Sequence, residues 1–222
     1  WDALREARGG AGVDGFLIPR ADAYQGENVA PRDERLAWLT GFTGSAGFCA
    51  VLDTIAGVFV DGRYRLQVKA QTSEKFTAVN WPETKLAGWL AEHAAEGAKL
   101  GYDPWLHTAD EIAQIRDAGH VVPVPVENLV DQIWSDQPPA PTEPLMAFDQ
   151  AVAGESAEVK RRRIAQTLTD AGQEAVALTL PDSIAWLLNI RGGDIARTPV
   201  PTCFAILSAD GSVDLFTGAL NT

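Results

Sequence analysis

Hydrophobic and polar positions follow two periodicities along residues 1–137. Short apolar runs rich in Val, Phe and Leu predict strands, and segments with apolar residues every three to four positions predict helices. The predicted strands are 13–19, 48–61 (a hairpin turning near 54–57), 98–102 and 121–126, and the predicted helices are 64–71, 85–94 and 108–118. Thr108 is a suitable N-cap for the last helix, and Gly119 is a suitable residue to end it. This succession of strands and helices is typical of an α/β domain.

The same two patterns return after a proline-rich connector. Four prolines fall within Gln-Pro-Pro-Ala-Pro-Thr-Glu-Pro at 137–144, and they favour an extended backbone that joins no sheet. Beyond it the pattern predicts a helix at 156–171 capped by Ser156, a strand at 175–180, a helix at 181–188 and a hairpin at 204–217. The chain therefore divides into a first domain at 1–137, a linker at 138–145 and a second domain at 146–222.

Parts of the two domains resemble each other. Leu-Ala-Trp-Leu-Thr-Gly-Phe-Thr-Gly at 36–44 matches Ile-Ala-Trp-Leu-Leu-Asn-Ile-Arg-Gly at 184–192, and a hairpin follows each segment. Such self-similarity predicts two related α/β domains. Thr217-Gly218, which matches Asp61-Gly62 of the first copy, stands close to the end of the sequence, so the second domain is expected to be incomplete. Trp38 and Trp186 occupy equivalent positions in apolar helices and are predicted to lie in the core.

The charge of the chain disfavours two classes of partner. Eighteen Lys and Arg against thirty Asp and Glu give a net charge of −12 over 222 residues, which repels a nucleic-acid backbone. No apolar run is long enough to span a bilayer, and the charged amino terminus is unlike a signal peptide. We therefore expect no nucleic-acid or membrane partner and a cytoplasmic location. The basic run 160–163 is interpreted as a solvated helical face.

The residues of common catalytic sites are sparse. The three histidines do not stand at the spacing that places two imidazoles on one helical face. The glycine-rich segment 41–47 lacks the Gly-Lys-Ser/Thr ending of a phosphate-binding loop, and a strand follows it. A turn that needs close backbone approach explains these glycines better. No catalytic residue, metal ligand or cofactor site is predicted in this chain.

Arg63 is the charged residue that packing explains least. It stands in Val-Asp-Gly-Arg-Tyr at 60–64, where a predicted strand passes into a predicted helix. Rigid elements on both sides of such a junction can aim a binding side chain. The second copy has Ala219 at the matching place, so the fold itself does not require arginine there. The alternative is a salt bridge to Asp61 with no binding role.

Several motifs together resemble one family. They are Tyr-Gln-Gly-Glu-Asn-Val-Ala-Pro-Arg-Asp-Glu-Arg at 24–35, the segment 38–47, Asp-Gly-Arg-Tyr at 61–64, Glu-Asn-Leu-Val-Asp-Gln-Ile-Trp at 127–134 and the segment 182–192. In this order they resemble the amino-terminal, non-catalytic domains of three-domain aminopeptidases P (Xaa-Pro aminopeptidases). The resemblance implies two tandem creatinase-type domains of ribonuclease-H-like α/β topology. It also implies a "pita-bread" catalytic domain that is not in this chain.

The resemblance further implies a function. The parent would be a metallopeptidase with two manganese(II) ions in the missing domain, which releases the amino-terminal residue of peptides with proline second. The present domains would gate substrate entry and support a homodimer. Arg63 would contact the bound peptide, and a guanidinium suits this role because it can fork onto carbonyl or carboxylate oxygens. Asn28 departs from the aromatic residue expected after Glu27.

Two other functions stay open from the sequence. Similar domains occur in non-catalytic pita-bread proteins, where the chain would belong to a peptide- or histone-binding module, and an acidic chain suits a basic partner. A relative that hydrolyses creatine or another small amide substrate is a weaker alternative, because such enzymes usually have one amino-terminal domain.

Overall fold

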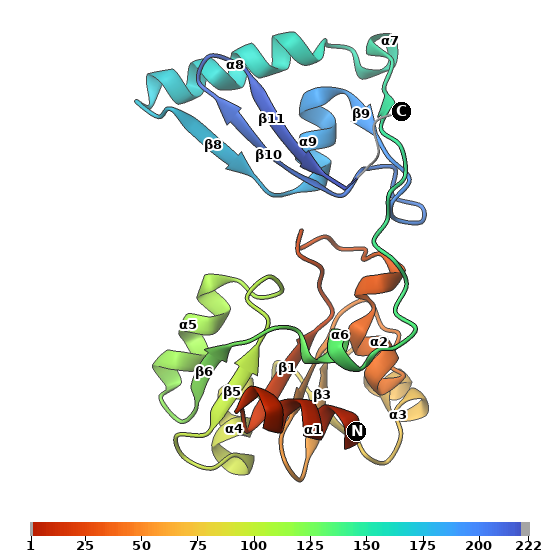
Figure 1. Cartoon of the computed structure of the whole chain (residues 1–222), viewed down its shortest axis with the longest axis vertical. Coiled ribbons are helices and arrows are strands. Elements are labelled where there is room, and N and C mark those ends of the chain that lie inside the picture. The colour runs from red at the N-terminus through yellow and green to blue at the C-terminus, as the bar shows by residue number, and fades with distance from the viewer. Residues whose placement is uncertain (1, 219–222) are drawn as a thin grey trace. The chain divides into compact units, whose positions relative to one another are not determined.

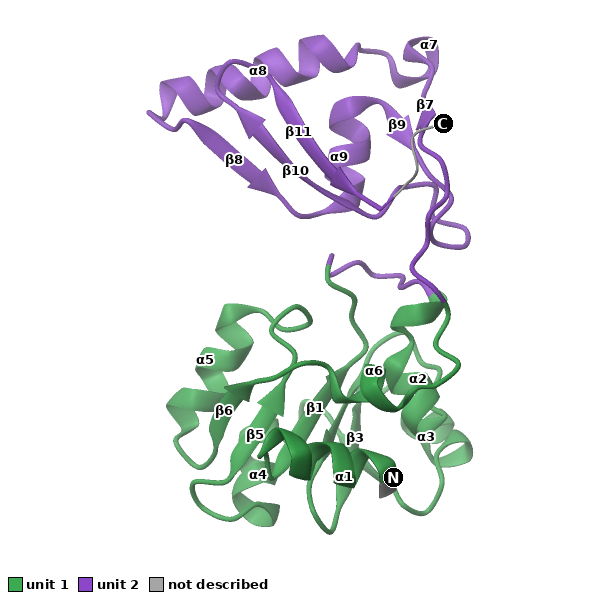
Figure 2. Ribbon diagram, in the orientation of Figure 1, with its two compact units in different colours: residues 1–23, 31–138 green, residues 24–30, 139–222 purple. Residues whose placement is uncertain are grey.

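The computed structural model describes residues 2–218 and separates into two compact units (Figure 2). The first unit comprises Trp1–Ala23 and Pro31–Pro138, and the second comprises Tyr24–Ala30 and Pro139–Thr222. Residues 24–30 therefore belong to the second unit, although in the sequence they lie between two stretches of the first unit. The proline-rich segment after residue 138 also belongs to the second unit.

A mixed six-stranded sheet forms the centre of the first unit (Figure 1). Its strands are β1 (Gly15–Pro19), β2 (Phe48–Val51), β3 (Ala56–Val60), β4 (Thr77–Asn80), β5 (Lys99–Tyr102) and β6 (Val122–Pro125). They lie in the order β4-β3-β2-β1-β5-β6, and β2 runs antiparallel to β1 and β3 while the other pairings are parallel. The ends of β1, β3 and β5 therefore lie at the same edge of the sheet, together with the beginning of β2.

Helices cover both faces of this sheet because successive strand residues point to opposite faces. Phe16 and Ile18 of β1 enter one core, and Leu17 between them enters the other. The first core is closed by α1 (Asp2–Ala11), α2 (Arg35–Thr40), α3 (Arg65–Gln71) and α6 (Leu129–Ile133), and the second by α4 (Leu86–His93) and α5 (Ala109–Ala118). A 3-10 turn at Pro31–Asp33 precedes α2. None of the helices in the described part of the chain is long and apolar enough to cross a membrane.

The second unit contains a three-stranded antiparallel sheet in the order β11-β10-β8. Its elements are α7 (Gln150–Ala153), α8 (Ala157–Asp170), β8 (Ala175–Leu178), α9 (Pro181–Leu188), β10 (Cys203–Ser208) and β11 (Val213–Thr217). A separate two-stranded ladder joins β7 (Met146–Ala147) to β9 (Ile190–Arg191). Leu168 of α8 and Leu187 of α9 pack on Leu207 of β10, so both helices lie on one face of the sheet.

The internal repeat is visible in the topology of the two units. Apart from the short strand β9, the order α8-β8-α9-β10-β11 repeats α1-β1-α2-β2-β3, with the strand order β3-β2-β1 in one unit and β11-β10-β8 in the other. Phe48 pairs with Phe59 in the first hairpin, whereas Phe204 pairs with Phe216 in the second, so the second hairpin is one residue longer. Ala219, the predicted counterpart of Arg63, lies outside the described residues. The predicted α/β fold class is confirmed.

The prediction that Trp38 and Trp186 are core residues is wrong. Their exposed fractions are 39% and 47%. Leu36 of α2 and Ile184 of α9 face the cores instead, and each tryptophan stands two residues further along its helix, on the outer side. Trp38 stacks on Trp134, the residue that follows α6, at a ring-centroid distance of 5.2 Å, so it covers the core without entering it.

The interpretation of residues 160–163 as one solvated face is also only partly correct. Lys160 is 2% exposed, and its Nζ donates to the Trp186 carbonyl oxygen at 2.9 Å and to Asn189 Oδ1 at 2.7 Å. Arg162 and Arg163 do lie on the outside of α8, paired with Glu158 and Glu155. Four consecutive residues surround most of a helix, so one of them must face inward.

Both cysteine thiols are buried, and we expect them to be unreactive in the folded chain. Burial raises the pKa of the Cys49 thiol far above its usual range and, with a contribution from the Asp194 charge, raises that of Cys203 to about 11. The thiolate is the nucleophile, so iodoacetamide at pH 8 should modify neither thiol within minutes, whereas both should react in guanidinium chloride. Mass spectrometry of the intact protein would detect the adducts. Rapid modification of either cysteine without denaturant would contradict its burial.

Candidate functional site

The turn formed by residues 61–64, here called the Asp61–Tyr64 turn, joins β3 to α3 and contains the predicted binding residue. Asp61 Oδ1 accepts from the Arg63 backbone nitrogen at 2.9 Å. The same carboxylate accepts from the Arg63 side chain, with Nε to Oδ1 at 3.0 Å and Nη2 to Oδ2 at 2.8 Å. The Arg63 side chain is 64% exposed, so the structure places a guanidinium on the surface at the end of a rigid strand.

The salt bridge that was the alternative explanation for Arg63 is therefore present, but it does not bury the side chain. The hydrogen bonds from Arg63 hold the pKa of the Asp61 carboxyl below its usual range, so the pair is ionised at neutral pH. An exposed pair of this kind adds little to stability. Its effect is to restrict where the guanidinium lies, which is compatible with a binding role.

The glycine-rich loop at 41–47 supports the Asp61–Tyr64 turn from the side. The hydroxyl groups of Ser45 and Tyr64 form a 2.6 Å hydrogen bond, which lowers the pKa of Tyr64. The buried Phe42 ring packs edge-on against the Tyr64 ring at 5.6 Å. A Cβ atom on Gly44 would lie 2.2 Å from the Phe42 ring, so glycine is required there by close approach. This confirms the interpretation of the glycines as a structural turn.

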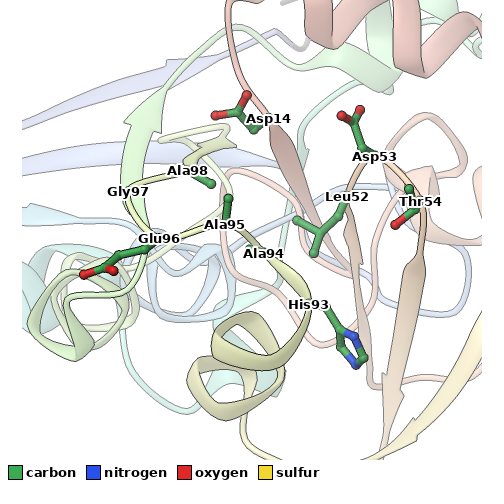
Figure 3. Close-up of a pocket in the computed structure, with 10 residues that line it drawn as sticks. All are labelled: Asp14, Leu52, Asp53, Thr54, His93, Ala94, Ala95, Glu96, Gly97 and Ala98. Atoms are coloured by element: carbon green, nitrogen blue, oxygen red, sulfur yellow. The ribbon is translucent and has the colours of Figure 1, made fainter.

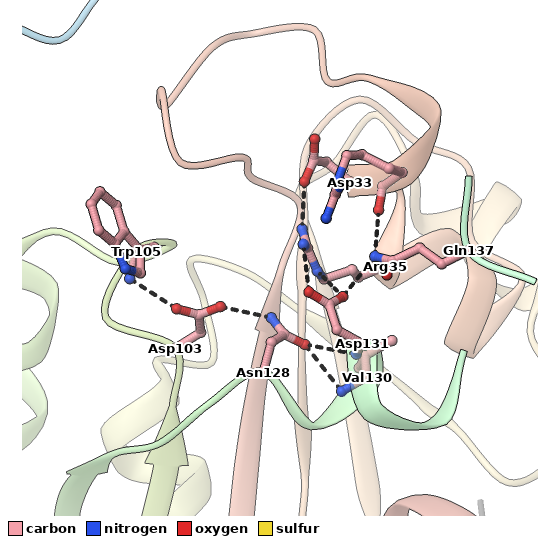
Figure 4. A network of polar contacts seen from close by, with 9 residues as sticks. Asp33, Arg35, Asp103, Trp105, Asn128, Val130, Asp131 and Gln137 are labelled. Atoms are coloured by element: carbon pink, nitrogen blue, oxygen red, sulfur yellow. Dashed lines mark hydrogen bonds and ion pairs between the residues drawn. The ribbon is translucent and has the colours of Figure 1, made fainter. Parts of the chain in front are cut away.

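A second group of polar contacts fixes the helices beside this edge of the sheet (Figure 4). Arg35, 5% exposed, donates from Nε and Nη2 to the two Asp131 oxygens at 2.6 and 2.9 Å, and from Nη1 to Asp33 at 2.8 Å. Gln137 also donates to Asp131, at 2.8 Å. These contacts join the start of α2 to α6 and to the chain that leaves the first unit.

Residues of the motif at 127–134 take part in the same group of contacts. Asn128 Oδ1 caps α6 by accepting from the backbone nitrogens of Val130 and Asp131, and its Nδ2 donates to Asp103 at 3.0 Å. Asp103 in turn accepts from the Trp105 backbone nitrogen (Figure 4). The motif residues therefore hold the loop after β5 and the end of the first unit in place. In this chain the contacts of these residues are structural.

A pocket of about 410 Å³ lies at the opposite edge of the sheet (Figure 3). It is lined by Asp14 before β1, by the turn between β2 and β3, and by the segment 93–98, which begins at the last residue of α4. Asp14 accepts from the Lys99 backbone nitrogen, and Asp53 accepts from Arg8, so both carboxylates already hold local structure. In Figure 3 the polar side chains around the pocket point in different directions, so they do not converge on a common ligand position.

The histidines are likewise occupied in local packing. His120 lies 2.9 Å from the Ala94 carbonyl oxygen, His107 lies beside Glu111 at the start of α5, and the His93 ring packs against Trp89. Within residues 2–218, no three His, Cys, Asp or Glu side chains are grouped as metal ligands. The described residues therefore offer no ligand set for the two metal ions, which the resemblance assigns to a different domain.

Comparison with known proteins identifies the family. The profile described as Creatinase/Prolidase N-terminal domain matches residues 1–133, and a second profile with the same description matches residues 136–222. The chain belongs to the creatinase/prolidase N-terminal domain family. These matches, together with the aminopeptidase P relatives described next, confirm the predicted resemblance.

Relatives with similar sequences bear the names of aminopeptidases. The chain is 34% identical over 210 residues to Aminopeptidase P2 of Arabidopsis thaliana, covering 90% of this chain and 30% of the relative. It is 37% identical over 219 residues to a probable Xaa-Pro aminopeptidase P of Coccidioides posadasii, covering 92% and 35%. The chain thus spans about a third of the length of these relatives.

A solved structure also superposes closely on the chain. The X-prolyl aminopeptidase of Caenorhabditis elegans matches with a TM-score of 0.87 and 29% identity, over 94% of this chain and 36% of that protein. That protein is described as a cytosolic enzyme with a di-nuclear active site. Arg63 stays a predicted binding residue. The contacts of Ser45 and Phe42 with Tyr64 do not follow from the sequence alone, because they depend on β2 and β3 being neighbours.

Proposed function

We propose that this chain is the amino-terminal region of a metal-dependent Xaa-Pro aminopeptidase and that Arg63 contacts the peptide at the entrance to the catalytic centre. The observation that supports the proposal most directly is the exposed guanidinium of Arg63, which is held by Asp61 at the end of β3 in a chain of this family. The substrates would be peptides with proline at the second position. The two metal ions, expected to be manganese(II), would be held by residues outside this chain.

The same proposal includes a location and an assembly. The C. elegans neighbour is described as cytosolic, which supports a cytoplasmic location for the parent protein. The two tandem units would gate access to the catalytic domain and contribute to a homodimer. Size-exclusion chromatography with light scattering on the full-length protein would measure that assembly, and a monomer at micromolar concentration would contradict it.

The activity is tested by comparing the full-length protein with the present chain. With manganese, the full-length protein should release the amino-terminal residue from a peptide with proline second, and it should fail on the same peptide with alanine second. The 222-residue chain alone should give no turnover above the blank. Turnover by the chain alone, or no turnover by the metal-loaded full-length protein, would refute the proposal. The second result would favour the non-catalytic binding module.

Replacing Arg63 with alanine in the full-length enzyme should lower kcat/KM by roughly 10–100-fold, because a guanidinium hydrogen bond to bound peptide is lost. The melting temperature should change by only a few degrees, since the Asp61 pair is exposed. The matched control is Arg65→Ala, which removes a guanidinium two positions away that pairs with Glu83. Equal kcat/KM values for Arg63→Ala and the native enzyme would remove Arg63 from the site.

A further inference from the structure

Asp61 holds Arg63 by one defined edge of the guanidinium. Its two oxygens receive Nε at 3.0 Å and Nη2 at 2.8 Å, and Oδ1 also receives the backbone nitrogen of Arg63 at 2.9 Å. One carboxylate therefore fixes both the start of the Arg63 side chain and its planar end group. The Nη1 side of the guanidinium is directed away from Asp61 by this arrangement, because the fork of donors is planar and rigid.

The face of the guanidinium is supported as well as its edge. The Arg63 Cζ atom lies 5.0 Å from the centroid of the Tyr64 ring, within the range of a cation–π contact. Tyr64 is itself held by its hydroxyl bond to Ser45 and by the buried Phe42 ring. An arginine side chain has many rotamers, and contacts along one edge and one face leave it few of them.

These contacts contribute little to the stability of the fold. The Asp61 and Arg63 side chains are 20% and 64% exposed, and they stand two residues apart in a turn that already follows a fully buried strand. An exposed ion pair between near neighbours stabilises a protein weakly, partly because ordering the long side chain opposes it. The order imposed on Arg63 therefore requires an explanation other than folding.

We propose that Asp61 is a positioning residue for peptide binding: it orders the Arg63 guanidinium before the peptide arrives. Tyr64, held by Ser45, supports the same orientation from the ring face. The proposal rests on the proposed function, since it requires Arg63 to contact peptide. A side chain that is ordered in advance loses less conformational entropy on binding, so binding is tighter.

The test is a double-mutant cycle in the full-length enzyme, with kcat/KM for a peptide with proline second as the readout. Asp61→Ala should lower kcat/KM about tenfold in the native background and by less than about twofold in the Arg63→Ala background. Asp61→Asn keeps an acceptor for the Arg63 backbone nitrogen and should give an intermediate loss. Tyr64→Phe removes only the hydroxyl bond to Ser45 and should lower kcat/KM by about twofold to fivefold, again in the native background alone.

The outcomes separate this inference from the proposed function. If Arg63→Ala leaves kcat/KM unchanged, Arg63 does not contact the peptide and the positioning role of Asp61 fails with it, whereas the proposed peptidase activity still stands on the turnover assay. If Arg63→Ala lowers kcat/KM while Asp61→Ala does not, the proposed function survives and the positioning role is refuted. Equal losses for Asp61→Ala in both backgrounds would also refute it, because Asp61 would then act independently of Arg63. Melting temperatures identify any variant that loses activity by unfolding. If Asp61→Ala is such a variant, the kcat/KM values of Asp61→Asn and Tyr64→Phe decide whether Asp61 positions Arg63.

Discussion

Replacing Arg35 with methionine should lower the free energy of unfolding of the first unit by about 3–5 kcal/mol, the usual cost of breaking a buried ion pair. Arg35 is 5% exposed and neutralises Asp33 and Asp131 at once. Methionine fills much of the same volume but donates no hydrogen bond, so two carboxylates lose their cation. Because these contacts join α2 to α6, the packing of both helices should loosen together.

Hydrogen exchange followed by mass spectrometry measures this effect locally, which matters for a chain of two units whose unfolding need not be two-state. Amides of α2 and α6 should exchange faster in Arg35→Met than in the native protein. The control is Arg65→Met on α3. It removes an exposed ion pair with Glu83 and should lower the free energy of unfolding by about 0.5 kcal/mol or less. Similar exchange rates in Arg35→Met and Arg65→Met would show that the buried network is not a determinant of stability.

The loss in Arg35→Met should also depend on pH. Burial raises the pKa of the Asp33 carboxyl, although the Arg35 charge acts in the opposite direction. Without Arg35 the pKa of Asp33 should rise further. A carboxyl whose pKa is raised on folding favours the folded state below that pKa and disfavours it above. The stability difference between native protein and variant should therefore narrow as the pH falls from 7 towards 4, and a constant difference would contradict this explanation.

The fold was largely predictable because its elements carry strong local signals. The strands β1, β2 and β3 are short apolar runs, and Thr108 is the N-cap of α5 that its position predicts. The repeat was detectable because the sequence of each unit has a similar apolar helix followed by a hairpin. In contrast, β4 is four residues long with a single buried position, so its pattern was too weak to recognise.

The errors in side-chain burial have a common physical cause. A helix as short as α2 makes less than two turns, and an apolar sequence does not show which side faces the core. Trp38 was therefore assigned to the wrong side. Lys160 was assigned to solvent because lysine is rarely buried, and its burial depends on acceptors supplied by another helix. No periodicity within α8 contains that information.

The candidate site, too, was only partly predictable from the sequence. The position of Arg63 at a strand-to-helix junction was evident from the sequence, whereas its contacts depended on the fold. Ser45 reaches Tyr64 only because β2 and β3 are antiparallel neighbours, which places the loop before one strand beside the turn after the other. Sequence spacing alone does not distinguish that contact from many alternatives. The salt bridge to Asp61 was predictable because it is local.

The burial of Lys160 leads to a second large expected effect on stability. Its ammonium group meets the carboxyl-terminal end of α9, where it donates to the Trp186 carbonyl oxygen and to Asn189 Oδ1. It also lies 4.6 Å from the centroid of the Trp186 ring. A cation is favourable at this end of a helix because the carbonyl groups there carry partial negative charge. The half-exposed Trp186 thus covers a buried cation.

Lys160→Met should consequently destabilise the second unit by about 2–4 kcal/mol, since methionine preserves the packing of the stem but leaves two partly buried acceptors without their donor. Faster hydrogen exchange in α8 and α9 would report the loss. Arg162→Met is the matched control on the same helix, because Arg162 is 73% exposed and pairs with Glu158, so its replacement should cost about 0.5 kcal/mol or less. If both variants exchange like the native protein, Lys160 does not hold α9 to α8, and the packing of Leu168 and Leu187 on β10 is sufficient to fix the two helices.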